Sequence, residues 1–336
     1  MLVVIFLFSL FQPPADISKP EVSPETSQSS SASQKKPEIT ELRAKAESGD
    51  IGAQLALANA YDTGDGVSQS DELAAKWYHK AAEQGNSEAQ NILGNLYRAG
   101  RGVERDKSLA LKWYRKATLQ RNSRAMFNLA TAYYNGDGVA IDDSKAFAWF
   151  TLALESGSKN ADEAVKRMKS EIAPWRITEA FKYVASIYEN GVELPRDLNE
   201  AVQWYRRAAA RGDRDAQISL AIVLLNGQGV PQDFTEARKW CEAAAKQNDS
   251  AGEYCLGVIH EKGLGVAPSL RDALKWYRLA AGWGHPRAMQ ALGNMYASGT
   301  GVKRDRPQAF VLLIRSAATG NEQALQDACK AQTGNG

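Results

Sequence analysis

Tryptophan recurs at a fixed spacing along most of this 336-residue chain. Trp77, Trp113 and Trp149 lie 36 residues apart, and after one longer step from Trp149 to Trp204 the same spacing returns. The later members of the series are Trp204, Trp240 and Trp276, with Leu312 at the next expected position. A fixed period of this length is typical of a solenoid, in which each repeat packs against its neighbours.

Other residue types keep the same phase and mark two helices in each repeat. Seven residues before each tryptophan position the chain carries only Ser or Asp, whose side chains cap the first turn of a helix. This column contains Ser70, Asp106, Asp142, Asp197, Asp233, Ser269 and Asp305. Most copies have Gly eight residues after the tryptophan position, where a helix ends in a left-handed turn. We therefore predict a tryptophan-bearing helix B in each copy, preceded by a helix A that ends at a G-x-G-V loop.

The combined pattern resembles the Sel1-like repeat, a relative of the tetratricopeptide repeat. Its elements are A-x-x-x-L-G-x-x-Y-x-x-G-x-G-V-x-x-D-x-x-x-A-x-x-W-Y-x-x-A-A, which residues 89–118 show almost whole. The resemblance covers about residues 53–320, with a half-copy at residues 46–49 before it. It implies an all-α, right-handed superhelical solenoid of about seven 36-residue helix-turn-helix repeats. It also implies that the chain binds a protein or peptide on the concave face formed by the A helices.

The repeat array is interrupted once, between Trp149 and Trp204. Within the extra residues Ala161–Met168 reads as a helix, and Pro174 suits the first position of another helix. The predicted organisation is an apolar leader at 1–11, a Ser/Pro-rich linker at 12–37, a first array at 38–157, a helical insertion at 158–178, a second array at 179–320, and a terminal cap and tail at 321–336. The linker has too few apolar residues to bury a core, so we expect it to be disordered.

The leader bears on where the protein works. Residues 2–10 read LVVIFLFSL, which is shorter than the roughly 20 residues that span a bilayer but matches the apolar core of a signal peptide. No Lys or Arg precedes the run and no good cleavage site follows it. A signal peptide, the remnant of a longer anchor and an apolar tail stay open as interpretations. We predict an exported, periplasmic or membrane-tethered protein of bacterial type, with a cytoplasmic location as the alternative.

The composition and motifs argue against several kinds of chemistry. The chain has 41 basic and 39 acidic residues, which gives no electrostatic reason to expect a nucleic-acid partner. The G-x-G loops follow helices and lack a Lys-Ser or Lys-Thr, so they do not predict a phosphate-binding loop. His79, His260 and His285 lie far apart, and no spacing suggests a catalytic triad or paired carboxylates. We predict that the chain is not an enzyme, needs no metal or cofactor, and contacts a membrane only through its N-terminal segment.

Two local departures from the pattern matter for the structure. In the fourth repeat Glu193 replaces the second glycine of the loop. If that position requires positive φ, Glu costs about 1–2 kcal/mol there, so we expect a loop of different shape. Cys241 and Cys255 lie symmetrically about the turn at Asn248. They are either a disulfide, which an oxidising compartment would permit, or two buried small side chains, which we favour. Cys329 falls in a small-residue column and is also expected to be buried.

The predicted binding face consists of three positions of helix A in every copy, which share one helical stripe as Asn91, Asn95 and Arg98 do in repeat two. The early copies and the last one are polar there, but repeat five carries Ile218, Ile222 and Leu225. An exposed apolar stripe marks an interaction site, whereas the alternative is that the helical insertion or tight curvature of the array covers these residues. The predicted partner-binding residues are Phe127, Tyr134, Ile218, Ile222, Leu225, Tyr254 and Val258.

We therefore predict a non-catalytic scaffold or adaptor for protein–protein interaction. One alternative is an envelope enzyme or ligand-binding protein that acts on cell-wall or β-lactam-like material. That alternative is weaker because the relatives that suggest it resemble proteins with a cysteine pair in every repeat, and this chain has three cysteines in all. A cytoplasmic adaptor is the other alternative. The sequence does not specify the partner or the oligomeric state.

Overall fold

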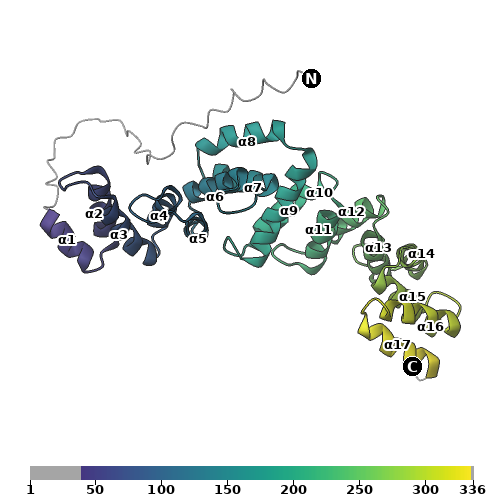
Figure 1. Ribbon diagram of the computed structural model, residues 1–336. Coiled ribbons are helices and arrows are strands. Elements are labelled where there is room, and N and C mark those ends of the chain that lie inside the picture. Colours follow the sequence, from purple (N-terminus) through teal and green to yellow (C-terminus); the bar gives the residue numbers. More distant parts are fainter. Residues whose placement is uncertain (1–38, 334–336) are drawn as a thin grey trace, which may run out of the picture. The chain divides into compact units, whose positions relative to one another are not determined.

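The computed structural model describes residues 39–333, and within this range it contains helices and no strand (Figure 1). The predicted leader, the linker and the last residues of the tail lie outside the described residues. The A helices are α2 (Ile51–Thr63), α4 (Ser87–Ala99), α6 (Ser123–Asn135), α9 (Pro174–Asn190), α11 (Arg214–Asn226), α13 (Ser250–Lys262) and α15 (Pro286–Ser298). The B helices are α3 (Asp71–Glu83), α5 (Lys107–Thr118), α7 (Asp143–Glu155), α10 (Leu198–Ala209), α12 (Phe234–Ala245), α14 (Leu270–Gly282) and α16 (Arg306–Ala317). The remaining helices are α1 (Ile39–Glu47) before the array, α8 (Asn160–Glu171) within it and α17 (Glu322–Thr333) after it.

Helices that follow one another in the chain pack together. In six of the repeats helix A packs against its own helix B, as α4 does against α5 and α15 against α16. Helix B then packs against helix A of the next copy, as α3 does against α4 and α14 against α15. The prediction of an all-α repeat array is therefore confirmed.

The predicted caps hold the B helices in place. The Ser70 side chain accepts a hydrogen bond from the Leu73 N–H, and the Asp106 carboxylate accepts one from the Leu109 N–H. The same arrangement occurs at Asp197, Asp233, Ser269 and Asp305. Each bond satisfies an N–H of the first helical turn that has no partner within the helix, so the Ser/Asp column sets where helix B begins.

The A helices have their own capping column, which the sequence analysis did not identify. It stands nine residues after the tryptophan position, where Asn86, Asn122, Asp213, Asp249 and His285 each accept a hydrogen bond from a backbone N–H of the helix that follows. Asp50 caps α2 in the same way. In most copies the preceding residue is the predicted glycine, and Gly85 has φ +91°. Arg121 and Asn248 hold that position instead with φ 57° and 58°, so these two residues adopt a left-handed conformation.

The G-x-G loops fix the spacing between repeats. In six loops the second glycine has φ between +68° and +77°. A Cβ atom at Gly102 would lie 2.1 Å from the carbonyl oxygen of Asp71, at the start of helix B in the preceding repeat. Glu193 has no positive φ, and its carboxylate instead accepts a hydrogen bond from the Tyr183 hydroxyl. The expected difference in the fourth loop is therefore confirmed.

Most of the tryptophan column lies in the core. Trp149 and Trp204 are fully buried, and Trp77 and Trp113 nearly so. Trp240 and Trp276 are half-buried and pack against the cluster that contains both Cys241 and Cys255. Trp175 and Trp283, outside the column, are exposed.

The extra residues between repeats three and four form α8 and the first turns of α9. Ala161, Val165 and Met168 are the buried residues of α8, in agreement with the predicted helix over residues 161–168. Pro174 occupies the first turn of α9, which then continues without a break into helix A of repeat four. The described chain divides into two compact units near this point: unit 1 contains Trp149–Val165 and the residues up to Asp142, and unit 2 contains Asp143–Ala148 and the residues from Lys166 onwards.

The expectation that Cys329 is buried was wrong, since its side chain is exposed. In earlier copies the small residue at this position faces the next helix B: a Cβ at Gly94 would lie 2.4 Å from the Tyr114 ring. No helix follows α17 within residues 39–333, so nothing there covers Cys329. In the same range, no helix is both long enough and apolar enough to cross a membrane.

Candidate protein-binding surface

Hydrogen bonds between polar side chains connect two A helices on the predicted binding face of unit 1. The Asn128 amide of α6 donates hydrogen bonds to the side-chain oxygens of Asn91 and Asn95 in α4, at 2.8 and 3.1 Å. The Tyr114 hydroxyl of α5 donates to the same Asn95 oxygen at 2.7 Å. These side chains bond to one another, so the face of repeats two and three is internally satisfied.

The same register returns in the last repeats. The Asp327 carboxylate of α17 accepts hydrogen bonds from Gln290 at 2.8 Å and from Asn294 at 3.1 Å. Asp327 and Asn128 stand at equivalent positions of their copies, as do Gln290 and Asn91. In both units, therefore, the residue at this position bonds to the first two stripe residues of the preceding copy.

In repeats four and six the residue after the tryptophan is a tyrosine that bonds to this face. Tyr205 donates its hydroxyl to Glu189 at 2.6 Å, and Tyr277 donates to Glu261 at 2.7 Å. Repeat five has Cys241 at this position, so it lacks the hydroxyl that needs a polar acceptor. Leu225 stands where the other two repeats carry the acceptor Glu. In repeat five, the apolar stripe therefore occurs together with the replacement of this tyrosine by Cys241.

Cys241 and Cys255 are bonded to each other in the structure. Their Cα atoms lie 6.0 Å apart, within the range that a disulfide requires, and the bond joins α12 to α13. Leu225 packs against the cluster of buried residues around this disulfide. The structure therefore has the disulfide, and not the two separate small side chains that the sequence analysis favoured.

The structure places the seven predicted partner-binding residues in unequal environments. Ile222 is 47% exposed, whereas Ile218 and Leu225 are half-buried. Tyr254 and Val258 are half-buried and pack against the core of repeats six and seven. Phe127 and Tyr134 lie in unit 1 and are half-buried, with the Phe127 ring in an edge contact with Phe150 at 5.1 Å. Packing between repeats covers most of the set, and Ile222 is the member that presents a large apolar surface.

An open pocket of about 340 Å³ adjoins the stripe between α13 and α15. Tyr254 forms its wall, and the Tyr254 ring stacks on His285 at a centroid distance of 4.7 Å. Glu261, Arg287 and Asn294 supply charged and amide groups. Burial, and then the nearby Arg287 guanidinium, lower the pKa of His285, so its imidazole stays neutral and keeps its capping bond to the Ala288 N–H.

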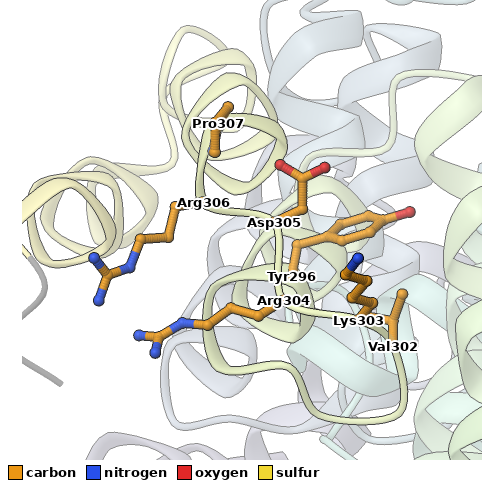
Figure 2. A pocket seen from close by; sticks show the side chains of 7 residues that line it. All are labelled: Tyr296, Val302, Lys303, Arg304, Asp305, Arg306 and Pro307. Atoms are coloured by element: carbon orange, nitrogen blue, oxygen red, sulfur yellow. The ribbon is translucent and has the colours of Figure 1, made fainter.

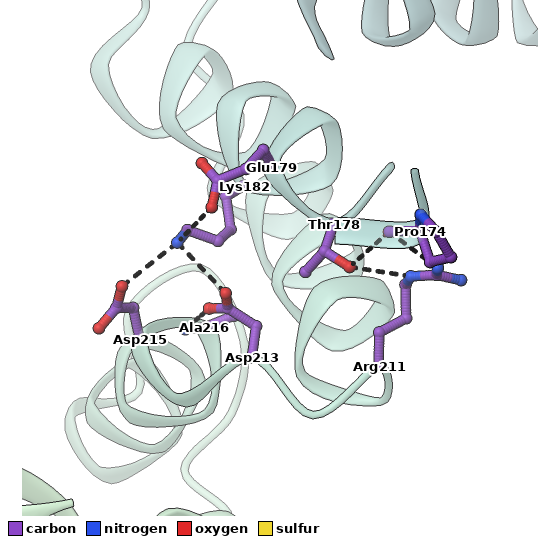
Figure 3. Close-up of polar contacts among 8 residues, drawn as sticks. All are labelled: Pro174, Thr178, Glu179, Lys182, Arg211, Asp213, Asp215 and Ala216. Carbon is purple, nitrogen blue, oxygen red and sulfur yellow. Dashed lines mark hydrogen bonds and ion pairs between the residues drawn. The ribbon is translucent and has the colours of Figure 1, made fainter. Parts of the chain in front are cut away.

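A cluster of charges borders the other end of the stripe (Figure 3). Lys182 of α9 reaches Glu179 at 3.1 Å, Asp213 at 3.3 Å and Asp215 at 3.2 Å, which joins α9 to the start of α11. Burial works to lower the pKa of Lys182, but the three carboxylates raise it above its ordinary value, so the ammonium stays charged. The Asp213 carboxylate also caps α11 through the Ala216 N–H. The cluster therefore holds repeats four and five together.

A second pocket, of about 630 Å³, lies at the loop between α15 and α16 (Figure 2). Two of its seven lining residues serve the fold: Asp305 caps α16, and the Arg304 Nε–H donates to the Ala297 carbonyl at 2.8 Å. Figure 2 shows Arg304 and Arg306 extending to one side of the loop and Tyr296 and Lys303 to the other. The basic side chains do not converge on one point, so the pocket is an open loop surface.

The side chains described above bring together no set that resembles a catalytic centre. Within residues 39–333 no group of three His, Cys, Asp or Glu side chains could hold a metal ion. His79, His260 and His285 serve packing and capping: His79 contacts the edge of Trp113, His260 is half-buried, and His285 caps α15. What the fold offers is a series of side-chain stripes displayed on stacked helices.

These features define a helical-repeat protein of the tetratricopeptide-like class. The chain belongs to the Sel1 repeat family, because the Sel1 repeat model matches seven segments: 51–86, 87–122, 123–158, 182–213, 214–249, 250–282 and 286–321. Members of this family are generally non-enzymatic scaffolds for protein–protein interaction.

Two solved structures are similar to the chain. One is c5321, a protective antigen of uropathogenic Escherichia coli with an SLR fold, at 32% identity and a TM-score of 0.49. The match covers 89% of this chain, which spans 60% of the length of the antigen. The other is a Sel1 repeat protein from Oxalobacter formigenes, at 30% identity over 86% of this chain and 78% of that one, with a TM-score of 0.42. No curated protein matches the chain.

Proposed function

We propose that this protein is a non-catalytic scaffold that binds a partner protein or peptide on the A helices of repeats five and six. The exposure of Ile222 carries the proposal. Its side chain is 47% exposed, whereas the stripes of repeats two and seven are polar and bond to the next copy. An exposed isoleucine between two satisfied polar regions gives an apolar side chain of a partner a place to dock.

The half-buried neighbours support the same surface. Ile218 and Leu225 flank Ile222 on α11, and the Tyr254 ring lies on the next helix A beside the pocket. A partner segment on this stripe would meet the carboxylates around Lys182 at one end and Arg287 at the other. Charged groups at both ends would set its direction and register.

The test compares two exposed apolar side chains on different faces. Ile222→Asp places a charge in the proposed surface, and Val311→Asp places one at a 52% exposed residue on α16. Each full-length variant and the wild type would be crosslinked in native extract of the source organism, with folding checked by circular dichroism. We expect a defined partner to be captured by the wild type and Val311→Asp and lost from Ile222→Asp. Equal capture by all three folded proteins would contradict the proposed surface.

We also propose that the protein works in an oxidising compartment, exported or tethered to a membrane. The support is the Cys241–Cys255 pair, since disulfides persist mainly in proteins outside the cytosol. Rapid acid quenching of intact cells followed by thiol alkylation and mass spectrometry measures the redox state of both residues. We expect them to be unmodified unless a reductant is added first. Full alkylation without reductant, together with protection of the protein from external protease, would favour the cytoplasmic alternative.

A further inference from the structure

Positive charge is concentrated in one part of a chain that is nearly balanced as a whole. Residues 98–124 contain nine Lys or Arg and two Asp or Glu, while the full chain has 41 and 39. Helix α5 has four basic residues and no acidic one. The rest of the chain is therefore net negative, and the basic segment in unit 1 is a local feature.

Part of this charge is neutralised inside the unit. Arg101 pairs with Asp62 and with Asp71, and Lys107 pairs with Asp137 at 2.6 Å. Arg124 lies 3.5 Å from Glu88. These pairs join neighbouring repeats, so three of the nine basic residues have a structural role.

Four exposed or half-buried lysines lie on two neighbouring B helices, two of them within the basic segment and two before it, and we call them the lysine ridge. Lys76 and Lys80 belong to α3, and Lys112 and Lys116 belong to α5. In each helix one lysine precedes the tryptophan and the other follows one turn later, so both point to the same side. A 5.6 Å edge contact between His79 of α3 and Trp113 of α5 places the two helices side by side.

The ridge lysines have no acidic partner among residues 39–333. Lys76, Lys112 and Lys116 are exposed and Lys80 is half-buried. The Lys80 and Lys116 ammonium groups lie over Trp77 and Trp113, at 4.3 and 4.0 Å from the ring centroids. A cation held over an indole is attracted to the ring and is more restricted than a free lysine side chain. Glu72, one turn before Lys76, and Glu83, one turn after Lys80, are exposed acidic residues of α3, and Glu83 lies 3.5 Å from His79.

The repeat pattern itself does not demand these lysines. The same two positions are Gln203 and Arg207 in repeat four, Lys239 and Ala243 in repeat five, Lys275 and Leu279 in repeat six, and Val311 and Arg315 in repeat seven. Within the described B helices, only α3 and α5 have lysine at both positions. The ridge is therefore a property of unit 1 and not of the fold.

We propose that the lysine ridge is a second interaction surface, which binds an acidic helical segment of a partner protein. Lysines one turn apart lie about 6 Å apart along each helix. Carboxylates one turn apart on a partner helix match that spacing. Four desolvated or partly desolvated pairs would steer the partner and speed its association.

The ridge fits a protein better than other polyanions. Trp77 and Trp113 are each 6% exposed, so the ridge has no aromatic face on which nucleic-acid bases stack. The isoelectric point of the chain is about 8.3, below the range typical of nucleic-acid-binding domains. Peripheral membrane surfaces combine basic residues with exposed Trp or Phe, and the ridge presents neither aromatic residue.

The test uses the full chain and a synthetic acidic helix. The probe is a fluorescent Ala-rich peptide of about 20 residues with Glu at every fourth position, which is long enough to form a helix. Its binding is measured by anisotropy at low and high salt. We expect Lys76→Glu with Lys112→Glu to weaken binding at least about tenfold. Lys239→Glu with Lys275→Glu changes the charge equally at the position before the tryptophan in unit 2, and we expect less than a twofold effect for this control.

Several outcomes would overturn the proposal. Equal weakening by both pairs of substitutions would show that only net charge matters. Ridge-dependent binding to duplex DNA, or to phosphatidylserine-containing vesicles, that is tighter than binding to the peptide would assign the surface to a different partner. The milder Lys76→Gln with Lys112→Gln variant guards against misfolding, and it should weaken peptide binding by a smaller factor while circular dichroism stays unchanged.

Discussion

Glu253 occupies the position in repeat six that Gln217 holds in repeat five, but its carboxylate cannot give the hydrogen bond that the Gln217 amide gives to the Ala209 carbonyl. That amide bond measures 3.2 Å, and Gln54 and Gln90 make the same bond to Ala46 and Ala82 at 3.1 Å. Glu253 is 4% exposed, and its Oε2 has no hydrogen-bond partner among the described residues. Glu253 therefore leaves incomplete a joint that Gln54, Gln90 and Gln217 each close.

Glu253→Gln should stabilise the protein at neutral pH. Burial raises the pKa of Glu253, opposed by a hydrogen bond from Trp283, so the folded state disfavours the ionised form. The penalty is absent below the ordinary pKa of 4.5 and complete above the raised folded value. We expect the free energy of unfolding to rise by about 1–2 kcal/mol at pH 7 and the gain to shrink towards pH 4.5. Urea unfolding at several pH values measures this, and Gln217→Glu should show the opposite sign.

His285→Asn should remove a loss of stability on acidification. The folded pKa of His285 lies below its ordinary value of 6.5 because of burial and Arg287, so the folded state binds fewer protons than the unfolded state. Stability therefore falls as pH drops from about 6.5 through the lower folded pKa. Asn caps α4 and α6 at the same position without titrating. Thermal unfolding at pH 7.5 and pH 5, in the Glu253→Gln background, isolates the effect. An unchanged pH dependence in the Asn variant would refute the role of the imidazole.

Arg121→Gly should stabilise repeat two. Arg121 has φ 57°, a conformation that costs a side-chain-bearing residue about 1–2 kcal/mol and costs Gly nothing. The greater freedom of Gly in the unfolded chain offsets part of this, which leaves a gain of up to about 1 kcal/mol in unfolding free energy. Asn248→Gly is the matched comparison at φ 58°, and it should gain less because Asn tolerates this region. A gain at Asn248 equal to that at Arg121 would contradict the explanation.

Gly102→Ala and Gly85→Ala separate backbone strain from packing between repeats. Both glycines have positive φ, at +69° and +91°, so both substitutions introduce strain. At Gly102 the new Cβ would also meet the Asp71 carbonyl, whereas at Gly85 no atom lies within 4 Å. Chemical denaturation should show a loss of about 1–2 kcal/mol for Gly85→Ala and a clearly larger loss for Gly102→Ala. Similar losses would mean that the close approach of the loop to the preceding repeat adds no cost of its own.

The parts of the fold that one repeat encodes could be predicted from the sequence. The Trp113 spacing, the Asp106 cap and the second loop glycine act within one copy or at a fixed distance, so self-comparison reveals them. The bonds between copies were missed, although they also have a fixed spacing. The Gln90 amide donates to the Ala82 carbonyl and the Gln217 amide to the Ala209 carbonyl, in both cases across a copy boundary and eight residues apart. Recognising them required knowing that the amide faces the carbonyl across the turn between helix B and the next helix A.

The binding face was harder to predict because exposure depends on the neighbouring copy. Ile218, Ile222 and Leu225 share one helical stripe, yet only Ile222 is exposed. Leu225 is covered by the cluster around the Cys241–Cys255 disulfide. The clue was present in the sequence, since Cys241 stands where most copies have tyrosine. Only the structure shows that the equivalent tyrosine hydroxyls of repeats four and six bond to Glu189 and Glu261, at the position that Leu225 occupies in repeat five.

The glutamine bonds at the joints between copies have a consequence for how the number of repeats can change. Gln54 and Gln90 make the same bond, to the Ala46 and Ala82 carbonyls of the preceding helix. Removal of one whole copy, residues 51–86, would therefore bring the Gln90 amide against the Ala46 carbonyl that Gln54 now bonds. Copy number can therefore drift by unequal recombination without a new core having to evolve. The disulfide between repeats five and six is an exception, because removal of either copy alone would leave an unmatched cysteine.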